Sequence, residues 1–424
     1  MFIEFSVTNY RSFSGKQTLS LTRARGIELL DSNVFKTDTT AGEMELLRSA
    51  AIYGPNAGGK TNLIMAVQTM KRIVLESAAQ GQRGDTLPVK PFLLGKNAPD
   101  SPTEFEAVFI ADRVRYQYGF AVTQERVLEE WLIAFPKGRP QHWYGRSWNE
   151  KKKKYDWEMG NSLLGKKQLW QESTRPNALF LSTAVQLNST QLQPVYDWFK
   201  YSLRMVNVDG WSPQFTASLC EQDGQRKKIL EFLKAADLGI QDIEVESEKL
   251  SAKHLPDDMP EELKGKLLED MKDTRVYDIQ TVHRSAEGKS IHFDFDEESD
   301  GTQKFFSLSG PFLDTLKNGY VLIIDELHDN FHPQMVKYLV NLFHDNKTNP
   351  NNAQLVFTTH ETSILNQEVF RRDQIWFCEK DDHQATVLYP LTDFSPRKGR
   401  ENLEAAYLSG RYGALPYLRA VNTR

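Results

Sequence analysis

The chain has 424 residues, enough for one large domain with insertions or for two to three lobes. Its net charge of −5 does not favour a polyanion, so nucleic acid would bind only through a local basic patch. Its two cysteines form no CxxC pair, which argues against a structural zinc and a secreted scaffold. There is no run of about 18 apolar residues and no signal-peptide layout, so we expect a cytoplasmic protein without membrane contact.

The chain opens with a predicted half-buried strand, in which Ile3, Phe5 and Val7 alternate with polar residues. A second strand is expected around 17–21. Between them lies Asn9-Tyr10-Arg11-Ser12-Phe13. Physical reasoning from the sequence alone makes Arg11 a solvated surface residue.

A glycine-rich stretch follows, and the rest of the chain is organised around it. It reads Gly54-Pro55-Asn56-Ala57-Gly58-Gly59-Lys60-Thr61 and fits the phosphate-loop pattern at every required position. The apolar run 50–53 before it predicts a buried strand, and 61–77 after it predicts a helix with one apolar face. The loop would wrap phosphates with its N–H groups, Lys60 would reach the β- and γ-phosphates, and Thr61 would bind Mg²⁺. We therefore predict a nucleotide site.

Residues 103–158 read as a meander of antiparallel strands after a loop at 78–102. Lys151-Lys152-Lys153-Lys154 stands beside Trp148, Tyr155 and Trp157. This basic run has two interpretations, a surface that binds nucleic acid and a solvated hairpin tip.

The apolar run 177–182 predicts another buried strand, and Gln186 follows it. Gln186 is either a sensor of the metal and γ-phosphate or an ordinary polar residue at a helix start. Residues 218–273 are charged and helical, and too short for a long coiled-coil arm, so a lid of a few helices is expected. Strands return at 277–282 and 290–295.

Two further apolar runs end in polar groups. Residues 320–324 precede Asp325 and Glu326, which suits a buried parallel strand that delivers carboxylates at its end. Asp325 would hold Mg²⁺ and Glu326 would polarise the attacking water. The run 354–359 ends at His360, which can hydrogen-bond the γ-phosphate or that water.

Ser299 and Gly301 stand at the start of a predicted helix over 305–316. Small residues at a helix N-terminus make an anion-binding cap. A second anion site in a protein with one nucleotide is explained most simply if it serves the nucleotide of a neighbouring subunit.

In this order, the elements resemble the ABC-type ATPase heads of the SMC and RecF kind. The resemblance implies an α/β fold, with a parallel or mixed sheet core around the phosphate loop, an antiparallel β lobe, a helical lobe and no long coiled coil. It implies a homodimer or higher homo-oligomer in which Ser299 and Gly301 match the signature, Asp329 crosses the interface and Arg11 lies near the phosphates. One departure is that the signature reads Ser-Asp-Gly-Thr rather than Leu-Ser-Gly-Gly-Gln.

More narrowly, the chain resembles the compact ATPases of prokaryotic phage-defence and abortive-infection systems (RloA, AbiL, PARIS and Septu), including its ending at 406–416. This resemblance implies a sensor that controls a separately encoded effector, a nuclease or toxin. The alternatives are a RecF-like DNA repair ATPase and an ATP-gated scaffold with negligible turnover. The expected division is an N-terminal lobe at 1–210, a helical lid at 211–280 and a C-terminal lobe at 281–424.

Overall fold

A computed structural model describes residues 1–95, 100–206, 212–256, 258–397 and 399–416. Contacts group the chain into two units, one of Met1–Val208 with Leu316–Arg424 and one of Asp209–Thr315. This grouping differs from the three lobes expected from the sequence. The reason is strand pairing, because strands from both ends of the chain share one sheet within the first unit.

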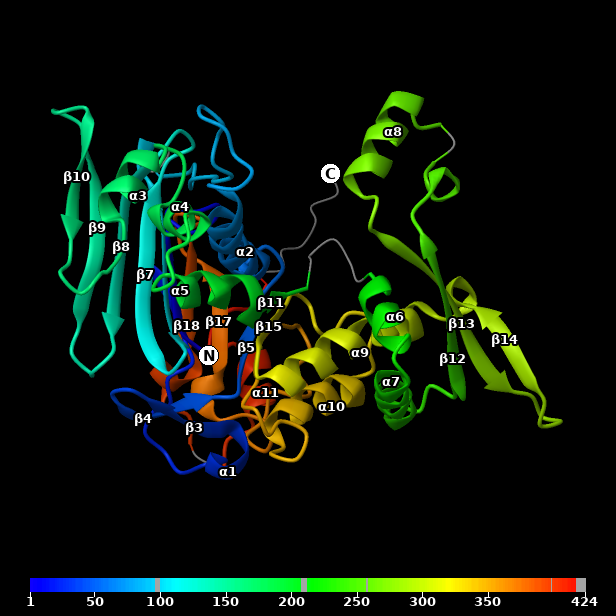
Figure 1. The fold of residues 1–424 in the computed structure, drawn as a ribbon. Coiled ribbons are helices and arrows are strands. Elements are labelled where there is room, and N and C mark those ends of the chain that lie inside the picture. Colours follow the sequence, from blue (N-terminus) through cyan, green and yellow to red (C-terminus); the bar gives the residue numbers. More distant parts are fainter. Residues whose placement is uncertain (96–99, 207–211, 257, 398, 417–424) are drawn as a thin grey trace, which may run out of the picture. The chain divides into compact units, whose positions relative to one another are not determined.

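The first unit contains an antiparallel sheet that forms the expected β lobe (Figure 1). Its strand order is β10 (Lys154–Met159), β9 (Gln141–Asn149), β8 (Val127–Phe135), β7 (Val114–Val122), β6 (Thr103–Ala111), β1 (Phe2–Thr8) and β2 (Gln17–Ser20). Inward residues alternate with outward ones along β6, as the sequence pattern predicts. A short hairpin of β3 (Val34–Thr39) and β4 (Gly42–Leu47) belongs to the same unit.

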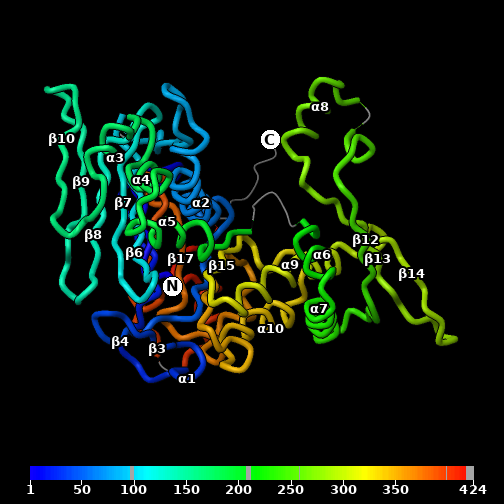
Figure 2. Tube along the Cα trace, viewed as in Figure 1, coloured from blue at the N-terminus to red at the C-terminus, as the bar shows by residue number. Residues whose placement is uncertain are grey.

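The second sheet of this unit is the parallel core that carries the phosphate loop. Its order is β11 (Leu203–Met205), β15 (Val321–Ile324), β16 (Gln354–Thr358), β5 (Ser49–Tyr53), β17 (Ile375–Lys380) and β18 (Thr386–Pro390). All pairings are parallel except that of β17 with β18. Helix α10 (Pro333–His344) connects β15 to β16 in the chain, and Figure 2 shows β15 and α10 on the trace. The strands β15, β16 and β5 therefore end at the same edge.

Helix α2 (Lys60–Glu76) joins the two sheets through a shared core. Its buried residues include Leu63 and Val67, which belong to one apolar cluster with Phe105 of the antiparallel sheet and Val356 of the parallel sheet. Burying such side chains contributes roughly 1.5–3 kcal/mol each. The first turn of α2, which closes the phosphate loop, is thus anchored on both sides.

Most of the other helices of the described residues are short. They are α1 (Leu30–Asn33), α3 (Lys167–Ser173), α4 (Phe180–Gln186), α5 (Gln193–Asp197), α6 (Gln214–Cys220), α7 (Asp223–Ala235), α8 (Glu261–Asp270), α9 (Asp300–Asn318) and α11 (Leu403–Leu408). The longest of those described is α9, with 19 residues.

The strand predicted at 177–182 is wrong, because α4 begins at Phe180. A short apolar run does not distinguish a strand from a buried helix by periodicity. The buried carboxylate of Glu130 accepts hydrogen bonds from the N–H groups of Phe180 and Leu181, at 2.7 and 3.0 Å. It therefore satisfies two N–H groups that a helix leaves unpaired at its start.

The second unit is less helical than its sequence predicted. The segment 218–273 contains strand β12 (Asp242–Lys249), which pairs with β13 (Arg275–Arg284), and β13 pairs with β14 (Ser290–Asp294). Ile243 and Val245 alternate with Asp242 and Glu244, which is the pattern of a half-buried strand. The strand was not predicted because the segment around it is strongly charged. The strands expected at 277–282 and 290–295 are confirmed as β13 and β14.

Candidate nucleotide site

The phosphate loop is a tight turn between β5 and α2. All five residues of β5 are buried, and α2 begins at Lys60. Gly54 has a φ of 149° and Gly59 a φ of 111°, in the region that favours glycine. A Cβ on Gly54 would lie 2.1 Å from the Cys378 carbonyl oxygen, and one on Gly59 would lie 2.1 Å from Thr386 Oγ1. Glycine is therefore required at both positions by packing as well as by φ.

Side chains from both ends of the chain hold the phosphate loop in place by hydrogen bonds. Thr386 Oγ1 donates to the Gly58 carbonyl oxygen at 3.0 Å and lies 2.9 Å from Ser12 Oγ. Ser12 Oγ also accepts from Asn62 Nδ2 at 2.8 Å, in the first turn of α2. Hydrogen bonds on two sides fix the loop backbone before any ligand is considered. Ser12, Asn62 and Thr386 were not predicted as site residues, because without the fold they are ordinary polar residues.

Lys60 lies across the loop it closes. Its Nζ donates to the carbonyl oxygens of Gly54 at 2.9 Å and Pro55 at 3.2 Å, and to Nε2 of His360 at 2.9 Å. The side chain is 5% exposed, and burial lowers the pKa of its ammonium group, an effect that nearby Glu326 and Asp325 oppose. The largely buried ammonium group of Lys60 therefore lies at the loop, where it can pair with phosphate oxygens.

Asp325 and Glu326 follow the buried strand β15 as predicted. Glu326 is exposed and has a φ of 52°, an uncommon conformation for a residue other than glycine. The N–H of Glu326 donates to Thr358 Oγ1 at 2.8 Å, and Thr358 Oγ1 donates to Asp325 Oδ1 at 2.5 Å. The end of β16 thus holds the acidic pair at the end of β15.

His360 lies two residues beyond the end of β16. The pKa of His360 is lowered to about 4, first by burial and then by the Lys60 and His328 side chains, against the opposing effect of Asp325. The backbone N–H of His360 donates to Nδ1 of His328 at 3.4 Å, and the two rings are 5.4 Å apart. The imidazole of His360 is therefore neutral at pH 7 and accepts a hydrogen bond from Lys60. His328 was assigned no role from sequence.

These residues fit Mg²⁺ together with a phosphate chain. Mg²⁺ usually keeps several waters and takes one or two carboxylates plus substrate oxygens. Asp325 offers a carboxylate, and Thr61 offers a hydroxyl in the first turn of α2. Among the described residues, no three His, Cys, Asp or Glu side chains cluster to hold a metal by themselves. The donor set matches a metal that is shared with a nucleotide.

Arg11 lies beside α2 rather than at the phosphate loop. Its Nε donates to the hydroxyl of Tyr10 at 3.2 Å, and that hydroxyl is 2.8 Å from Thr69 Oγ1. Thr69 is nine residues beyond Lys60, about 13 Å along the helix axis. The guanidinium group lines an open cleft of about 480 Å³ with Arg72 and Lys90. The neighbouring residue, Ser12, is the one that contacts Asn62 and Thr386 beside the phosphate loop.

Gln186 is also placed away from the loop. It is the last residue of α4, and Ser182 of that helix donates from Oγ to the Val74 carbonyl oxygen at 2.5 Å. Val74 lies 14 residues beyond Lys60, about 21 Å along α2. Gln186 is one helical turn, about 5 Å, from Ser182, which is too short to cover the distance of about 21 Å to Lys60. The interpretation of Gln186 as a sensor of the metal and γ-phosphate is therefore wrong.

Ser299 precedes the first turn of α9 as predicted. Its Oγ accepts from the N–H of Thr302 at 3.2 Å, and its carbonyl oxygen accepts from Gln303 at 2.9 Å, which makes it the N-cap. Ser299 is exposed, and Gly301 lies in the first turn of the helix. The residues therefore form a helix N-terminus of the expected type, and their role toward a nucleotide stays a prediction.

The basic run 151–154 lies at the turn between β9 and β10. Lys152 pairs with Asp156 at 3.2 Å, and Lys153 pairs with Glu150. Trp148 packs against Tyr155, with ring centroids 5.1 Å apart, within the same hairpin. These contacts are those of a hairpin tip. Nucleic-acid binding by this run stays untested.

The segment 406–416 packs near the strand that leads into the phosphate loop. The ring of Tyr407 lies 6.0 Å from Tyr53, the residue before Gly54, and 5.3 Å from Phe377 of β17. On the same helix, Glu404 accepts from Thr362 Oγ1 at 2.7 Å, two residues beyond His360. Helix α11 is thus part of the unit that carries the phosphate loop.

The fold is that of an ABC-type P-loop ATPase head, in which the histidine strand lies between the phosphate-loop strand and the acidic strand and all three are parallel. A family model described as "AAA domain, putative AbiEii toxin, Type IV TA system" matches residues 49–366. This chain belongs to that family. No curated protein matches it.

Several solved structures are similar to this chain. An SMC head domain from Thermotoga maritima is 12% identical over 92% of this chain and 98% of its own, with a TM-score of 0.38. An SMC head with an extended coiled coil, bound to the C-terminal domain of ScpA derived from Pyrococcus furiosus, is 12% identical over 92% and 96%, with a TM-score of 0.40. The recombination mediator RecF with ATP is 14% identical over 84% and 93%, with a TM-score of 0.34. No helix among the described residues is long and apolar enough to cross a membrane.

Proposed function

We propose that this chain binds and hydrolyses ATP. The observation that supports this most directly is the meeting of three chemical groups at the ends of adjacent parallel strands. Lys60 follows β5, Asp325 and Glu326 follow β15, and His360 follows β16, which lies between them. The loop offers N–H groups to an anion, the acids offer a metal ligand and a base, and the neutral imidazole offers a hydrogen bond.

In this proposal each residue has a separate role. Lys60 exchanges its bonds to the loop carbonyl oxygens for bonds to phosphate oxygens. Thr61 and Asp325 hold Mg²⁺, which neutralises charge on the phosphates. Glu326 accepts a proton from the attacking water, and neutral His360 hydrogen-bonds that water or the γ-phosphate.

The test is Glu326→Gln, which keeps the size of the side chain but removes its basicity. We expect ATP binding to stay close to that of wild type and turnover to fall about 10²–10⁴-fold, the usual scale for a general base. Glu287→Gln is the matched control, since Glu287 lies at the exposed turn between β13 and β14. Turnover of Glu326→Gln within threefold of wild type would refute the assignment.

We further propose that two copies form a homodimer with two ATP molecules between them, and that higher oligomers assemble from such dimers. The support is the exposed N-terminus of α9, where Ser299 and Gly301 present a small-residue cap suited to a phosphate of the second copy. Asp329, which is exposed beyond Glu326, would cross the same interface. ATP would join the halves, and hydrolysis would release them.

The measurement is molar mass with and without Mg-ATP, in the Glu326→Gln background. We expect the molar mass to double when Mg-ATP is added. With the additional substitution Ser299→Arg, which adds a bulky cation to the cap, we expect the protein to remain a monomer. Gly224→Arg, at an exposed position with open space around it in the first turn of α7, is the control and should still dimerise. A strict monomer in Glu326→Gln with Mg-ATP would overturn the dimer.

The biological role that we propose is a sensor and regulatory subunit of an anti-phage, abortive-infection system that controls a separately encoded effector, a nuclease or toxin. The family description supports it, because it names a putative AbiEii toxin and a type IV toxin–antitoxin system. The test is phage challenge of cells that carry the neighbouring reading frame with wild type, with Glu326→Gln or alone. Protection that does not depend on this chain would refute the role, and DNA-stimulated hydrolysis without protection would favour a repair ATPase.

A further inference from the structure

A threonine that the assigned roles leave out connects two of the catalytic strands. Thr358 is the last residue of β16, is 0% exposed, and lies between Asp325 on one side and the phosphate-loop strand on the other. A hydroxyl group has one proton to donate and two lone pairs to accept. Thr358 uses the proton toward Asp325 Oδ1, at 2.5 Å, and accepts the N–H of Glu326 at 2.8 Å.

The direction of these bonds is fixed by their partners. An ionised carboxylate only accepts, and a backbone N–H only donates, so the hydroxyl proton must point toward Asp325. The main chain adds a third link, because the N–H of Leu327 donates to the Thr358 carbonyl oxygen at 3.1 Å. One residue therefore holds the side chain of Asp325 and the backbone on both sides of the Glu326 side chain.

This anchoring explains the backbone of Glu326. A φ of 52° is unfavourable for glutamate unless its surroundings hold it. The two bonds to Thr358 and the turn in which Asp329 N–H donates to the Glu326 carbonyl oxygen, at 3.0 Å, are the contacts that do so. The conformation leaves the Glu326 side chain exposed at the strand end, where a base must meet water.

We propose that Thr358 is a positioning residue that sets both the metal-binding carboxylate of Asp325 and the direction of the Glu326 base. The inference rests on the proposed ATPase function and adds to it a residue that touches neither nucleotide nor metal. Thr358 lies on the strand that leads to His360, so a movement of that strand would be transmitted to the acidic pair. Partners of this kind are typically worth 10- to 100-fold in metal affinity or activity.

The experiment compares Thr358→Val, which keeps the shape without the hydroxyl, with Thr358→Ser, which keeps the hydroxyl. We expect Thr358→Val to lower kcat about 10- to 100-fold while KM for ATP changes less than about threefold. Thr358→Ser should recover most of the lost kcat. Thr183→Val is the matched control, because Thr183 is also buried, with its Oγ1 donating to the Leu179 carbonyl oxygen at 2.9 Å on α4.

A second readout does not depend on turnover. In a titration of ATP binding with Mg²⁺, Thr358→Val should need about tenfold more Mg²⁺ for half-maximal binding, and Thr183→Val should match wild type. The inference is overturned if Thr358→Val matches wild type in both readouts, if Thr358→Ser is as impaired as Thr358→Val, or if Thr183→Val loses as much kcat. If wild type binds Mg-ATP without hydrolysing it, the ATPase proposal fails and the Mg²⁺ titration alone decides for or against Thr358.

Discussion

Lys60 and His360 are joined by a hydrogen bond of 2.9 Å between Nζ and Nε2, although 300 positions separate them in the sequence. The bond makes Nε2 an acceptor, so the neutral imidazole carries its proton on Nδ1. The pKa of His360 is lowered to about 4 by burial and then by the Lys60 and His328 side chains. The phosphate loop and the histidine strand are therefore coupled directly by one ammonium group.

This coupling leads to a prediction for Lys60→Ala. We expect tight ATP binding to be lost, because the loop keeps its N–H groups but loses the cation that reaches the β- and γ-phosphates. The pKa of His360 should rise in the same variant, because a positive charge is removed from beside it. Calorimetry measures the first effect and NMR titration the second. Lys71→Ala is the control, since Lys71 is on the same helix but donates to the Leu203 carbonyl oxygen, away from the loop. Unchanged ATP affinity in Lys60→Ala would contradict the assignment.

A second prediction separates packing from backbone strain in the loop. Gly59 and Gly42 have similar φ values, 111° and 117°, but of the two only Gly59 has a neighbour in the way, because a Cβ there would lie 2.1 Å from Thr386 Oγ1. Gly59→Ala should abolish ATP binding, because the loop must shift to admit the methyl group. Gly42→Ala should lower stability by about 1–2 kcal/mol through φ alone and keep ATP binding. Equal loss of binding in both variants would show that the Thr386 contact does not matter.

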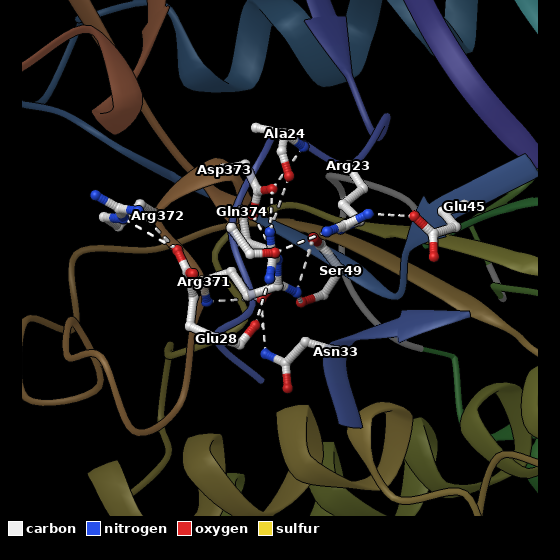
Figure 3. A network of polar contacts seen from close by, with 11 residues as sticks. Arg23, Ala24, Glu28, Asn33, Glu45, Ser49, Arg371, Arg372, Asp373 and Gln374 are labelled. Carbon is white, nitrogen blue, oxygen red and sulfur yellow. Dashed lines mark hydrogen bonds and ion pairs between the residues drawn. The ribbon is translucent and has the colours of Figure 1, made fainter. Parts of the chain in front are cut away.

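A third prediction concerns the buried polar network shown in Figure 3. Arg371 is 1% exposed and pairs with Asp373 at 2.8 Å, and its guanidinium group also donates to the carbonyl oxygens of Glu28 and Ala24. Arg371→Met leaves Asp373 buried without its charge partner, which typically costs about 3–5 kcal/mol of unfolding free energy.

Urea unfolding measures the loss of unfolding free energy in Arg371→Met, and a variant that removes a surface ion pair serves as the control. Arg72→Met removes the exposed pair with Glu76 on α2 and should cost no more than about 0.5 kcal/mol. A loss in Arg371→Met as small as that in Arg72→Met would mean that the network between residues 24–33 and 371–374 adds little stability.

The sequence predicted the parts of the site that obey a local pattern. The phosphate loop has a fixed spacing and the strands that end in Asp325 and His360 are continuous apolar runs, so both could be predicted without the fold. Thr358 could not, because its role depends on which strand lies beside β16. Its only signal in the sequence is a polar residue at the end of a buried run.

The errors have the same physical origin. A helix begins at Phe180, within the predicted strand 177–182, where the carboxylate of Glu130, about 50 residues earlier, caps it, and a window of six residues does not contain that information. The strand β12 was hidden by its glutamates, which face outward once β13 pairs with it. In both cases a distant partner decided the structure, as tertiary contacts override local propensity.

The last prediction concerns acid stability and His344. This residue is fully buried, with Nε2 2.8 Å from Ser49 Oγ and 3.4 Å from Gln374 Nε2, and burial, followed by the charge of Arg48, lowers its pKa to about 3. In the unfolded chain the pKa is near 6.5, so between pH 6.5 and 3 the unfolded state binds a proton that the folded state does not.

Unfolding free energy should therefore fall as pH drops below about 6.5, by about 1.4 kcal/mol per pH unit from this group, and His360 should add to the slope over a narrower pH range because its pKa is lowered less, to about 4. In His344→Gln the slope between pH 6.5 and 5 should be shallower by about that amount, even though the variant is less stable at every pH. His383→Gln, on the exposed turn before β18, is the control and should keep the slope of wild type. Urea unfolding at half-unit pH steps measures it, and identical slopes in His344→Gln and wild type would refute the role of this histidine.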